Sequence, residues 1–238
     1  MILCLETATS VCSAALCNSS GVVGLRESSE DKSHASLLTV FIEELLKDSG
    51  IKPGDLEAVA VSKGPGSFTG LRIGVSVAKG IAYATSIPLI GIETTLSMFH
   101  GIRQLAGIKE MTGIGTLFCP MIDARRMEVY YSVFDKDGNK IKNISADIID
   151  ENSFSEYPAD IRMIFFGDGA LKYKGILKRP DIYFAGDFRI SASHMQLPAY
   201  RALEESRFED VAYFEPYYFK NFITTKPVKN ILGNLLAR

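Results

Sequence analysis

Residues 56–74 read LEAVAVSKGPGSFTGLRIG, and this stretch decides the fold. The apolar run at its start predicts a short buried strand. Gly64 and Gly66, one on each side of Pro65, then allow a sharp turn. Ser67 or Thr69 can cap the helix that follows, which we expect to extend to Thr85. The stretch therefore predicts a strand, a glycine-rich turn and a helix, in that order.

The turn presents backbone N–H groups at the start of a helix, an arrangement that favours a bound anion. Its spacing matches neither the P-loop nor the dinucleotide-binding fingerprint. A tight turn that only caps the helix explains the sequence equally well. If an anion or a nucleotide binds, the expected contacts in this turn are Gly64, Gly66, Ser67 and Thr69.

The same helix carries a small side chain at every fourth position, namely Gly70, Gly74, Ala78 and Ala82. These residues share one face of the helix, and small side chains let another element approach closely. The neighbour is either the sheet or first helix of the same domain, or a helix of a partner protein.

The chain around this stretch supplies the rest of one lobe. We expect strands at 2–5, 11–17, 21–27 and 87–92, and helices from Ser33 or His34 to Ser49 and from Thr94 to about residue 106. The order β-β-β-α-β-α-β-α combines antiparallel connections with parallel crossovers. It resembles the duplicated half-domain of the actin, Hsp70 and sugar-kinase superfamily. The resemblance implies a two-lobed α/β fold with ribonuclease H-like lobes, each a mixed sheet flanked by helices.

Residues 107–115 are rich in glycine and predict the joint between the lobes, so we expect domains at 1–106 and 107–238. The expected elements of the second are strands at 116–122, 127–134, 140–144 and 161–166, a helix after residue 169, and a helix from 192 to about 205.

Gly167 and Gly169 lie in a turn that is similar to the adenosine loop of the superfamily kinases, although a plain turn explains it equally well. From Pro216 onward there are basic residues and no acidic ones, so this tail either is solvated or contacts nucleic acid.

The composition restricts the classes of function. The 238 residues carry a formal net charge of −2, which gives no overall attraction to nucleic acid or membranes. The four cysteines lack C-x-x-C spacing and indicate reduced thiols. No pair of the three histidines forms a local metal motif. We therefore expect no metal. No export leader and no membrane-spanning segment is apparent, so we expect a cytoplasmic protein.

Three segments resemble the signature segments of the bacterial TsaB (YeaZ) family. They are KGPGSFTGLRIG at 63–74, IDARRMEVY at 122–130 and EPYYFKN at 215–221. The resemblance implies a non-catalytic subunit that forms a heterodimer with TsaD, its relative in the same superfamily. The pair would support threonylcarbamoyl transfer to the tRNA adenosine next to the anticodon, and the ATPase TsaE would join the complex. Contact with tRNA would be indirect.

Two comparisons with the superfamily support the non-catalytic reading. In the catalytic relative an H-x-x-x-H metal motif follows the glycine-rich turn, its helix and the next strand, and its histidines fall on Thr94 and Met98 here. Neither side chain replaces an imidazole ligand. The first strand ends in Glu6-Thr7 where the family usually has Asp-Thr, and its loop lacks the glycine that lets phosphate approach. These features argue against tight ATP binding. A weak ATP or ADP site, or one at the shared interface, stays open.

We expect the partner to contact the first helix and the small-residue helix. The expected exposed contacts are His34, Leu37, Leu38, Phe41, Leu45, Gly70, Leu71, Gly74, Val75, Ala78 and Ala82. The same surface could form a homodimer when TsaD is absent. The alternative function is an enzyme of the same fold, an ATP-dependent phosphotransferase or a peptidase. A third reading, an RNA-binding module, rests on the basic tail alone.

Overall fold

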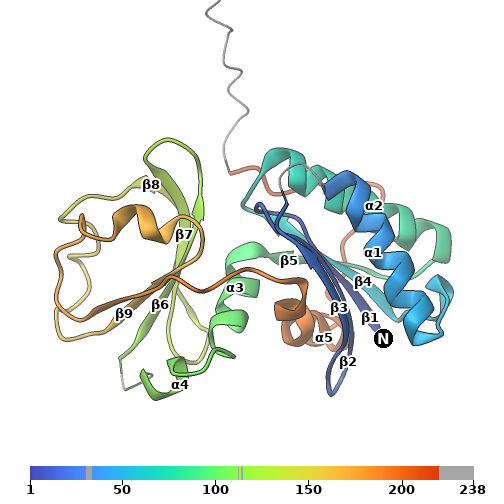
Figure 1. Cartoon of the computed structure of the whole chain (residues 1–238), viewed down its shortest axis with the longest axis horizontal. Coiled ribbons are helices and arrows are strands. Elements are labelled where there is room, and N and C mark those ends of the chain that lie inside the picture. Colours follow the sequence, from blue (N-terminus) through green and yellow to red (C-terminus); the bar gives the residue numbers. More distant parts are fainter. Residues whose placement is uncertain (31–33, 112, 114, 220–238) are drawn as a thin grey trace, which may run out of the picture.

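Two five-stranded sheets form the framework of the chain (Figure 1). The computed structural model describes residues 1–30, 34–111, 113 and 115–219. The first sheet contains β1 (Ile2–Glu6), β2 (Cys12–Asn18), β3 (Gly21–Ser28), β4 (Ala58–Gly64) and β5 (Leu89–Glu93). The second contains β6 (Leu117–Asp123), β7 (Glu128–Phe134), β8 (Lys140–Ile148), β9 (Met163–Phe166) and β10 (Ile182–Ala185).

The second sheet repeats the topology of the first. The order β3-β2-β1-β4-β5 corresponds to β8-β7-β6-β9-β10. In both sheets the first three strands are antiparallel neighbours, and the last two add in parallel through longer crossovers. The structure therefore confirms the two-lobed α/β fold. Strand β10 was not predicted, because residues 178–187 mix charged residues with only a short apolar run.

The helices cover the sheets. They are α1 (His34–Ser49), α2 (Phe68–Thr85), α3 (Thr94–Ile102), α4 (Ile108–Met111) and α5 (Gln196–Glu204), with short 3₁₀ helices η1 (Pro53–Asp55), η2 (Ala170–Tyr173) and η3 (Ala192–Met195). The helix expected after residue 169 is only the one-turn η2, and α3 ends four residues before its expected end. None of the helices in the described part of the chain is long and apolar enough to cross a bilayer. The start expected at Ser33 and the tail after residue 219 lie outside the described residues.

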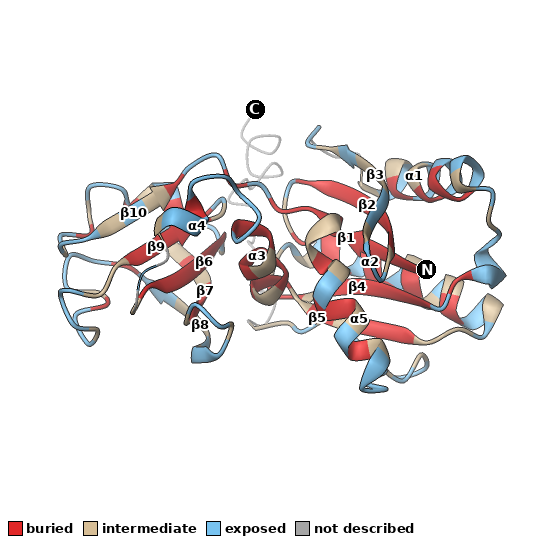
Figure 2. Ribbon diagram, turned by 90° about the horizontal axis from the view of Figure 1, so that it is seen from below, coloured by how far each residue is buried: buried red, intermediate tan, exposed pale blue. Residues whose placement is uncertain are grey.

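Strands β1 and β4 of the first sheet, which pair in parallel, are buried on both faces. Helices α1 and α2 pack on one face through Leu38, Leu45 and Ala78, among others. Helix α5 and η3 pack on the opposite face, where Met195 and Ala199 meet the alternate residues of β1, β2 and β4. Figure 2 shows the buried strands enclosed between partly exposed helices.

The expected second domain, residues 107–238, therefore needs correction. After β10 the chain leaves the second lobe and returns to the first, where η3, α5 and the residues up to 219 complete its core. The physical reason is that the strands of the first sheet are apolar on two faces, and residues 1–106 cover the second face only in part, through the contacts of α3 with β4 and β5. A break between domains at residue 106 would leave the apolar residues beneath η3 and α5 exposed to water.

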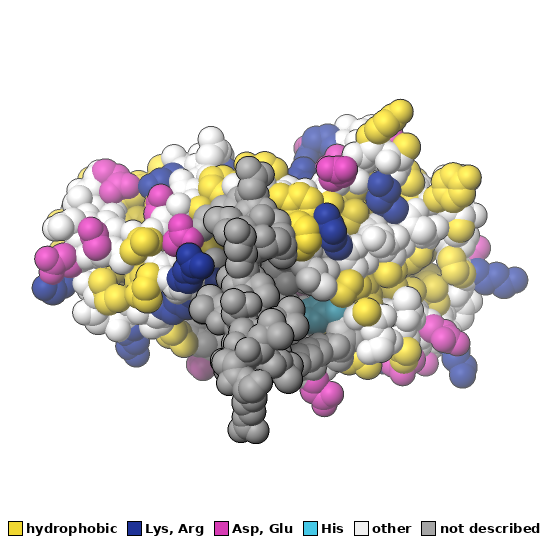
Figure 3. All heavy atoms as spheres, turned by 90° about the horizontal axis from the view of Figure 1, so that it is seen from above, with side chains coloured by type: hydrophobic (Ala, Val, Ile, Leu, Met, Phe, Trp, Pro, Cys, Tyr) yellow, Lys and Arg dark blue, Asp and Glu magenta, His cyan; other side chains and the backbone are white. Residues whose placement is uncertain are grey.

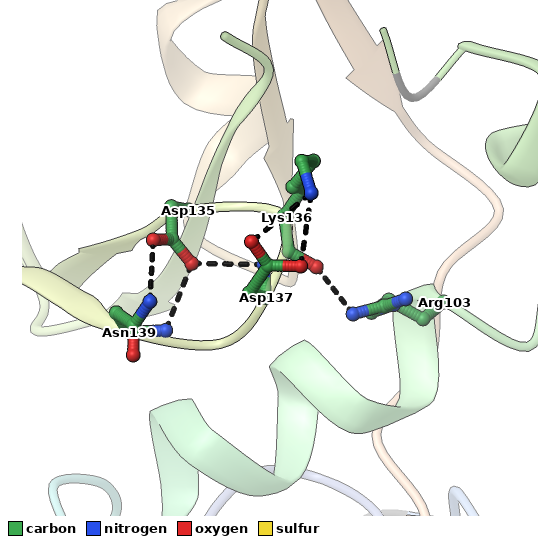
Figure 4. Close-up of polar contacts among 5 residues, drawn as sticks. All are labelled: Arg103, Asp135, Lys136, Asp137 and Asn139. Atoms are coloured by element: carbon green, nitrogen blue, oxygen red, sulfur yellow. Dashed lines mark hydrogen bonds and ion pairs between the residues drawn. The ribbon is translucent and has the colours of Figure 1, made fainter. Parts of the chain in front are cut away.

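Helix α3 joins the two lobes. It contacts β4 and β5 on one side and β6 and β7 on the other. Its Phe99 is buried against Phe118 and Phe134 of the second lobe. The turn between β7 and β8 lies against the end of α3, where Arg103 donates to the Lys136 carbonyl (Figure 4). Within that turn, Asp135 accepts hydrogen bonds from the backbone N–H groups of Asp137 and Asn139, which holds its shape.

Candidate functional site

The glycine-rich turn is formed as the sequence predicts. Strand β4 ends at Gly64, and α2 begins at Phe68 with Ser67 as its N-cap. The Ser67 hydroxyl accepts the Gly70 N–H at 3.2 Å. The Ser67 N–H donates to the Ala8 carbonyl at 2.7 Å, so the turn is tied to the loop that connects β1 and β2.

The small-residue stripe of α2 faces its own lobe: Gly70 and Gly74 meet this same loop, and Ala78 and Ala82 pack in the core. A Cβ atom on Gly70 would lie 2.0 Å from the Thr7 carbonyl oxygen, and one on Gly74 would lie 2.3 Å from the Thr7 hydroxyl. A Cβ atom on Gly66 would lie 2.3 Å from the Ala8 carbonyl oxygen. The glycines are therefore required by the close approach of the β1–β2 loop. Of the two neighbours considered for the stripe, the sheet or first helix of its own domain and a helix of a partner protein, the structure supports packing within its own domain.

The expected exposure of the partner contacts was consequently wrong for most of them. Eight are buried in the described chain because they face its own sheet or β1–β2 loop: Leu38, Leu45, Gly70, Leu71, Gly74, Val75, Ala78 and Ala82. Of the other three, Leu37 and Phe41 are half-buried, and His34 uses its Nε2 atom for a 3.0 Å contact with the Thr9 carbonyl. A sequence pattern of apolar positions identifies one face of a helix, but it does not tell whether that face meets a sheet or a partner.

The outward face of α1 and α2 consists of other residues. On α2 a second stripe of small side chains, Ser76, Gly80 and Ala84, is exposed at a spacing of four. Partly exposed apolar side chains flank it, and a Cβ atom on Gly80 would meet nothing within 4 Å. We call the following set the outer helix face: Leu37, Val40, Phe41, Ile73, Ser76, Val77, Gly80, Ile81 and Ala84.

The three signature segments of the sequence meet in space. The Tyr217 N–H donates to the Lys63 carbonyl at 2.6 Å, and its own carbonyl oxygen lies beside Gly64. Tyr218 packs on Phe68 with ring centroids 4.9 Å apart. Phe219 reaches Tyr130 of β7, with centroids 6.0 Å apart. Residues 207–219, which we call the strap, thus connect the glycine-rich turn of the first lobe with the second lobe.

The strap was not predicted, because its contacts are long-range. Phe214 is buried in the core beneath α2, and Lys79 donates to the carbonyl oxygens of Ala212 and Phe214. Glu209 continues the first sheet by pairing with Leu89. The resemblance of residues 215–221 to a family signature was the only sequence signal for this region.

A groove between the lobes runs along the strap and β8. Both of its lysines are paired with carboxylates in the structure. Lys63 lies 3.2 Å from Glu209, and Lys140 pairs with Glu93 across the lobe boundary. An anion in this groove would have to displace a carboxylate, so the groove does not form a ready phosphate site.

Glu6, which the superfamily comparison singled out, is fully buried. Its Oε1 atom accepts the Ala8 N–H at 2.6 Å and the Ser62 hydroxyl at 2.9 Å. Its Oε2 atom has no hydrogen-bond partner in the described chain. Burial away from water raises the pKa of this carboxyl to about 7, because desolvation outweighs the hydrogen bonds that lower it. The carboxyl is directed into the protein and does not face the groove.

Thr94 and Met98, at the positions of the expected metal motif, are buried at the beginning and middle of α3. Within the described ranges, no three His, Cys, Asp or Glu side chains gather closely enough to hold a metal ion. The thioether of Met98 packs against Gly167, where it fills the space that a Cβ atom would occupy.

Gly167 and Gly169, two of the predicted nucleotide contacts, are closely surrounded by other parts of the protein. Beside Gly167 the carbonyl of Met121 would lie 2.3 Å from an added Cβ atom, and beside Gly169 the side chain of Val129 would lie 2.7 Å away. These glycines are explained by close packing of β6 and β7 on the turn. Ser67 and Thr69 are exposed at the start of α2, so an anion contact there stays a prediction.

The comparisons with known proteins agree with the resemblance. The family model described as "TsaD: tRNA N6-adenosine threonylcarbamoyltransferase" matches residues 20–223. The TsaB protein of Escherichia coli, named a tRNA threonylcarbamoyladenosine biosynthesis protein, is 29% identical over 94% of this chain and 96% of its own length. A tRNA N6-adenosine threonylcarbamoyltransferase of Halalkalibacterium halodurans is 42% identical over 30% of this chain and 21% of its own length. The solved structure of YeaZ from Pseudomonas aeruginosa is similar in fold, with a TM-score of 0.74 at 22% identity, covering 92% of this chain and 99% of that one.

Proposed function

The chain belongs to the family described as TsaD, tRNA N6-adenosine threonylcarbamoyltransferase, and from this premise we propose that it acts in threonylcarbamoyladenosine biosynthesis as the TsaB-type subunit. Its likeness to Escherichia coli TsaB over nearly the whole of both chains supports this role over that of the transferase itself. In this proposal the chain is non-catalytic. Buried Thr94 and Met98 stand where the catalytic relative carries its metal histidines, and neither supplies an imidazole.

We further propose that the outer helix face binds TsaD in a four-helix contact. The observation that carries this part is the exposed small-residue stripe of α2 between partly exposed apolar side chains. Small side chains let two helix backbones approach, and the flanking apolar groups become buried when they do. Figure 1 shows α1 and α2 side by side on the outer surface of the first lobe. The same face would form a homodimer when TsaD is absent, because a self-complementary patch suits two-fold symmetry.

The remaining parts of the proposal concern the larger assembly. TsaE would join the TsaB–TsaD pair, tRNA would be bound mainly through the partner, and the work would take place in the cytoplasm. A weak nucleotide, or one held at the shared interface, is compatible with the exposed start of α2.

The test uses two substitutions on the outer helix face, Gly80→Arg and Val40→Arg. Both positions are exposed, and Gly80 has open space around it, so the fold should be retained. Ile148→Arg is the matched control, because Ile148 is an apolar side chain, 64% exposed, on β8 of the other lobe. Sedimentation of each chain, alone and mixed with TsaD of the same organism, measures association, and threonylcarbamoyl transfer is assayed on the same samples.

We expect the wild-type and Ile148→Arg chains to form a one-to-one complex and to support transfer, and the other two variants to do neither. A wild-type dissociation constant for both outer-face variants would contradict the proposed interface. Nucleotide turnover by the isolated chain, or transfer activity without TsaD, would contradict the non-catalytic role and favour an enzyme of the same fold.

A further inference from the structure

An arginine and two aromatic rings form a stack at the start of α2. The guanidinium of Arg72 lies 4.1 Å from the ring centroid of Phe68 and 5.8 Å from that of Tyr218. Its Nε atom donates to the Tyr218 hydroxyl at 3.0 Å. The stack fixes the direction of an exposed arginine that would otherwise be free to rotate.

The ring contacts continue across the lobe boundary to β7, which follows a turn that carries two arginines. From Tyr218 the strap runs on to Phe219, whose ring meets Tyr217 in the strap and Tyr130 in β7. Tyr130 lies just after the β6–β7 turn, where Arg125 and Arg126 are exposed and both adopt left-handed backbone angles. Figure 1 shows the strap ending between the two lobes, and Figure 3 shows Lys and Arg side chains on both lobes beside this boundary.

The three arginines have no acidic partner in the described part of the chain. The carboxylates near the β6–β7 turn are already engaged. Asp123 pairs with Lys172 and accepts the Arg125 N–H at 2.7 Å, and Asp168 accepts the Asp123 N–H at 3.0 Å. The guanidinium groups are therefore available to an anionic partner, although the chain as a whole carries a net charge of −2.

We propose that this surface contacts the tRNA substrate directly, and we call it the arginine–aromatic strip: Phe68, Arg72, Arg125, Arg126, Tyr217 and Tyr218. The proposal rests on the proposed function, which makes tRNA the substrate of the complex. Guanidinium groups bind phosphate oxygens in a bidentate manner, and exposed aromatic rings stack with unpaired bases of RNA loops. Tyr217, with 48% of its surface exposed, is the ring best placed to stack.

Charge favours RNA over a protein as the occupant of the strip. The sequence that follows the strip, residues 220–238, contains four basic residues and no acidic one, so positive charge continues along the chain. The strip combines cations with aromatic rings, and these two kinds of group bind the phosphates and the unpaired bases of RNA. Arg125, Arg126 and Tyr217 lie outside the outer helix face, whereas Arg72 precedes Ser76 by one helical turn and continues its exposed stripe.

The test is the binding of a fluorescein-labelled anticodon stem–loop RNA, followed by fluorescence anisotropy across a salt series. It is performed on the chain alone and on its complex with TsaD. The double variant Arg125→Gln/Arg126→Gln is compared with Lys178→Gln/Arg207→Gln, which removes the same charge from exposed sites outside the strip. Tyr217→Ala is compared with Tyr217→Phe, which keeps the ring. Sedimentation with TsaD is measured for every variant.

We expect the double strip variant to bind RNA more weakly and to lower the slope of log Kd against log salt by about 1 to 2, because two phosphate contacts are lost. The control pair should match the wild type. Tyr217→Ala should weaken binding by about tenfold, and Tyr217→Phe should not.

Two results would overturn the strip as an RNA contact. One is RNA binding by the double strip variant that equals that of the control pair at every salt concentration. The other is the loss of TsaD association in place of RNA affinity, which would assign the strip to a protein partner. Conversely, a chain that binds RNA through the strip but ignores TsaD would contradict the proposed function while leaving the strip in place.

Discussion

Replacement of Glu6 by glutamine should stabilise the protein at neutral and alkaline pH. The carboxyl is fully buried, and loss of hydration raises its pKa from the ordinary 4.5 to about 7. Above that pH the folded protein must hold an uncompensated charge. Glutamine has nearly the same shape and keeps an oxygen that can accept from Ala8 and Ser62 without the charge.

The size of the effect follows from linkage. A carboxyl whose pKa is raised on folding contributes stability that is fully present below pH 4.5 and is lost as the pH rises through about 7. At about 1.4 kcal/mol per pH unit, the interval between these two values corresponds to about 3 kcal/mol. We therefore expect Glu6→Gln to exceed the wild type in unfolding free energy by up to about 3 kcal/mol at pH 8, with the difference shrinking toward pH 4.5.

The assay is urea unfolding of both proteins at closely spaced pH values between 4.5 and 8.5. The difference between the two curves is the quantity of interest, because other groups that titrate in this range affect both proteins alike. A difference that does not change with pH would refute the reasoning, since it would mean that the Glu6 carboxyl keeps its ordinary pKa in the fold.

Two further predictions concern glycine and histidine residues. Gly70→Ala should lower the unfolding free energy by about 3 kcal/mol, because the added Cβ atom would press on the Thr7 carbonyl. Gly80→Ala should raise the unfolding free energy by about 0.5–1 kcal/mol, because the space around that position is open. Equal effects of the two substitutions in urea unfolding would contradict this prediction. His100 of α3 and His194 of η3 are half-buried where these two helices meet, and their partial loss of hydration lowers the pKa of each to about 4. The stability that these neutral histidines contribute is present above pH 6.5 and is lost as the pH falls toward 4. His194→Gln should therefore reduce the fall in unfolding free energy between pH 6.5 and 4. An unchanged fall over this range would refute the lowered pKa of His194.

Much of the first lobe could be predicted because its signals are local. The apolar spacing of α1 predicted that helix, and the glycine stop predicted its end at Ser49. The turn chemistry around Pro65 located the junction of β4 and α2. Patterns of this kind depend on a few neighbouring residues, and the backbone follows them whatever lies further away.

The incorrect predictions concern features that depend on contacts between residues far apart in the sequence. Four of the eight buried residues in the expected interface are small side chains whose role depends on Thr7, Val61 and other residues distant in the chain. The strap and the return of α5 to the first sheet depend on pairing between residues more than 100 positions apart. No periodicity in one segment contains that information, so the second domain was drawn too large and most of the expected contact residues were chosen from the buried side of α2.

The return of the chain to the first lobe also affects the order in which the protein can be completed on the ribosome. The first sheet is translated within about the first two-fifths of the chain, yet the residues that cover its second face lie in η3 and α5, beyond residue 191. Until these residues emerge, the nascent sheet exposes an apolar surface that includes Ile90 and Ala60. Synthesis at about 5–20 residues per second leaves that surface uncovered for several seconds. The second lobe can complete its own sheet first, so the lobe that is made first is the last to be finished.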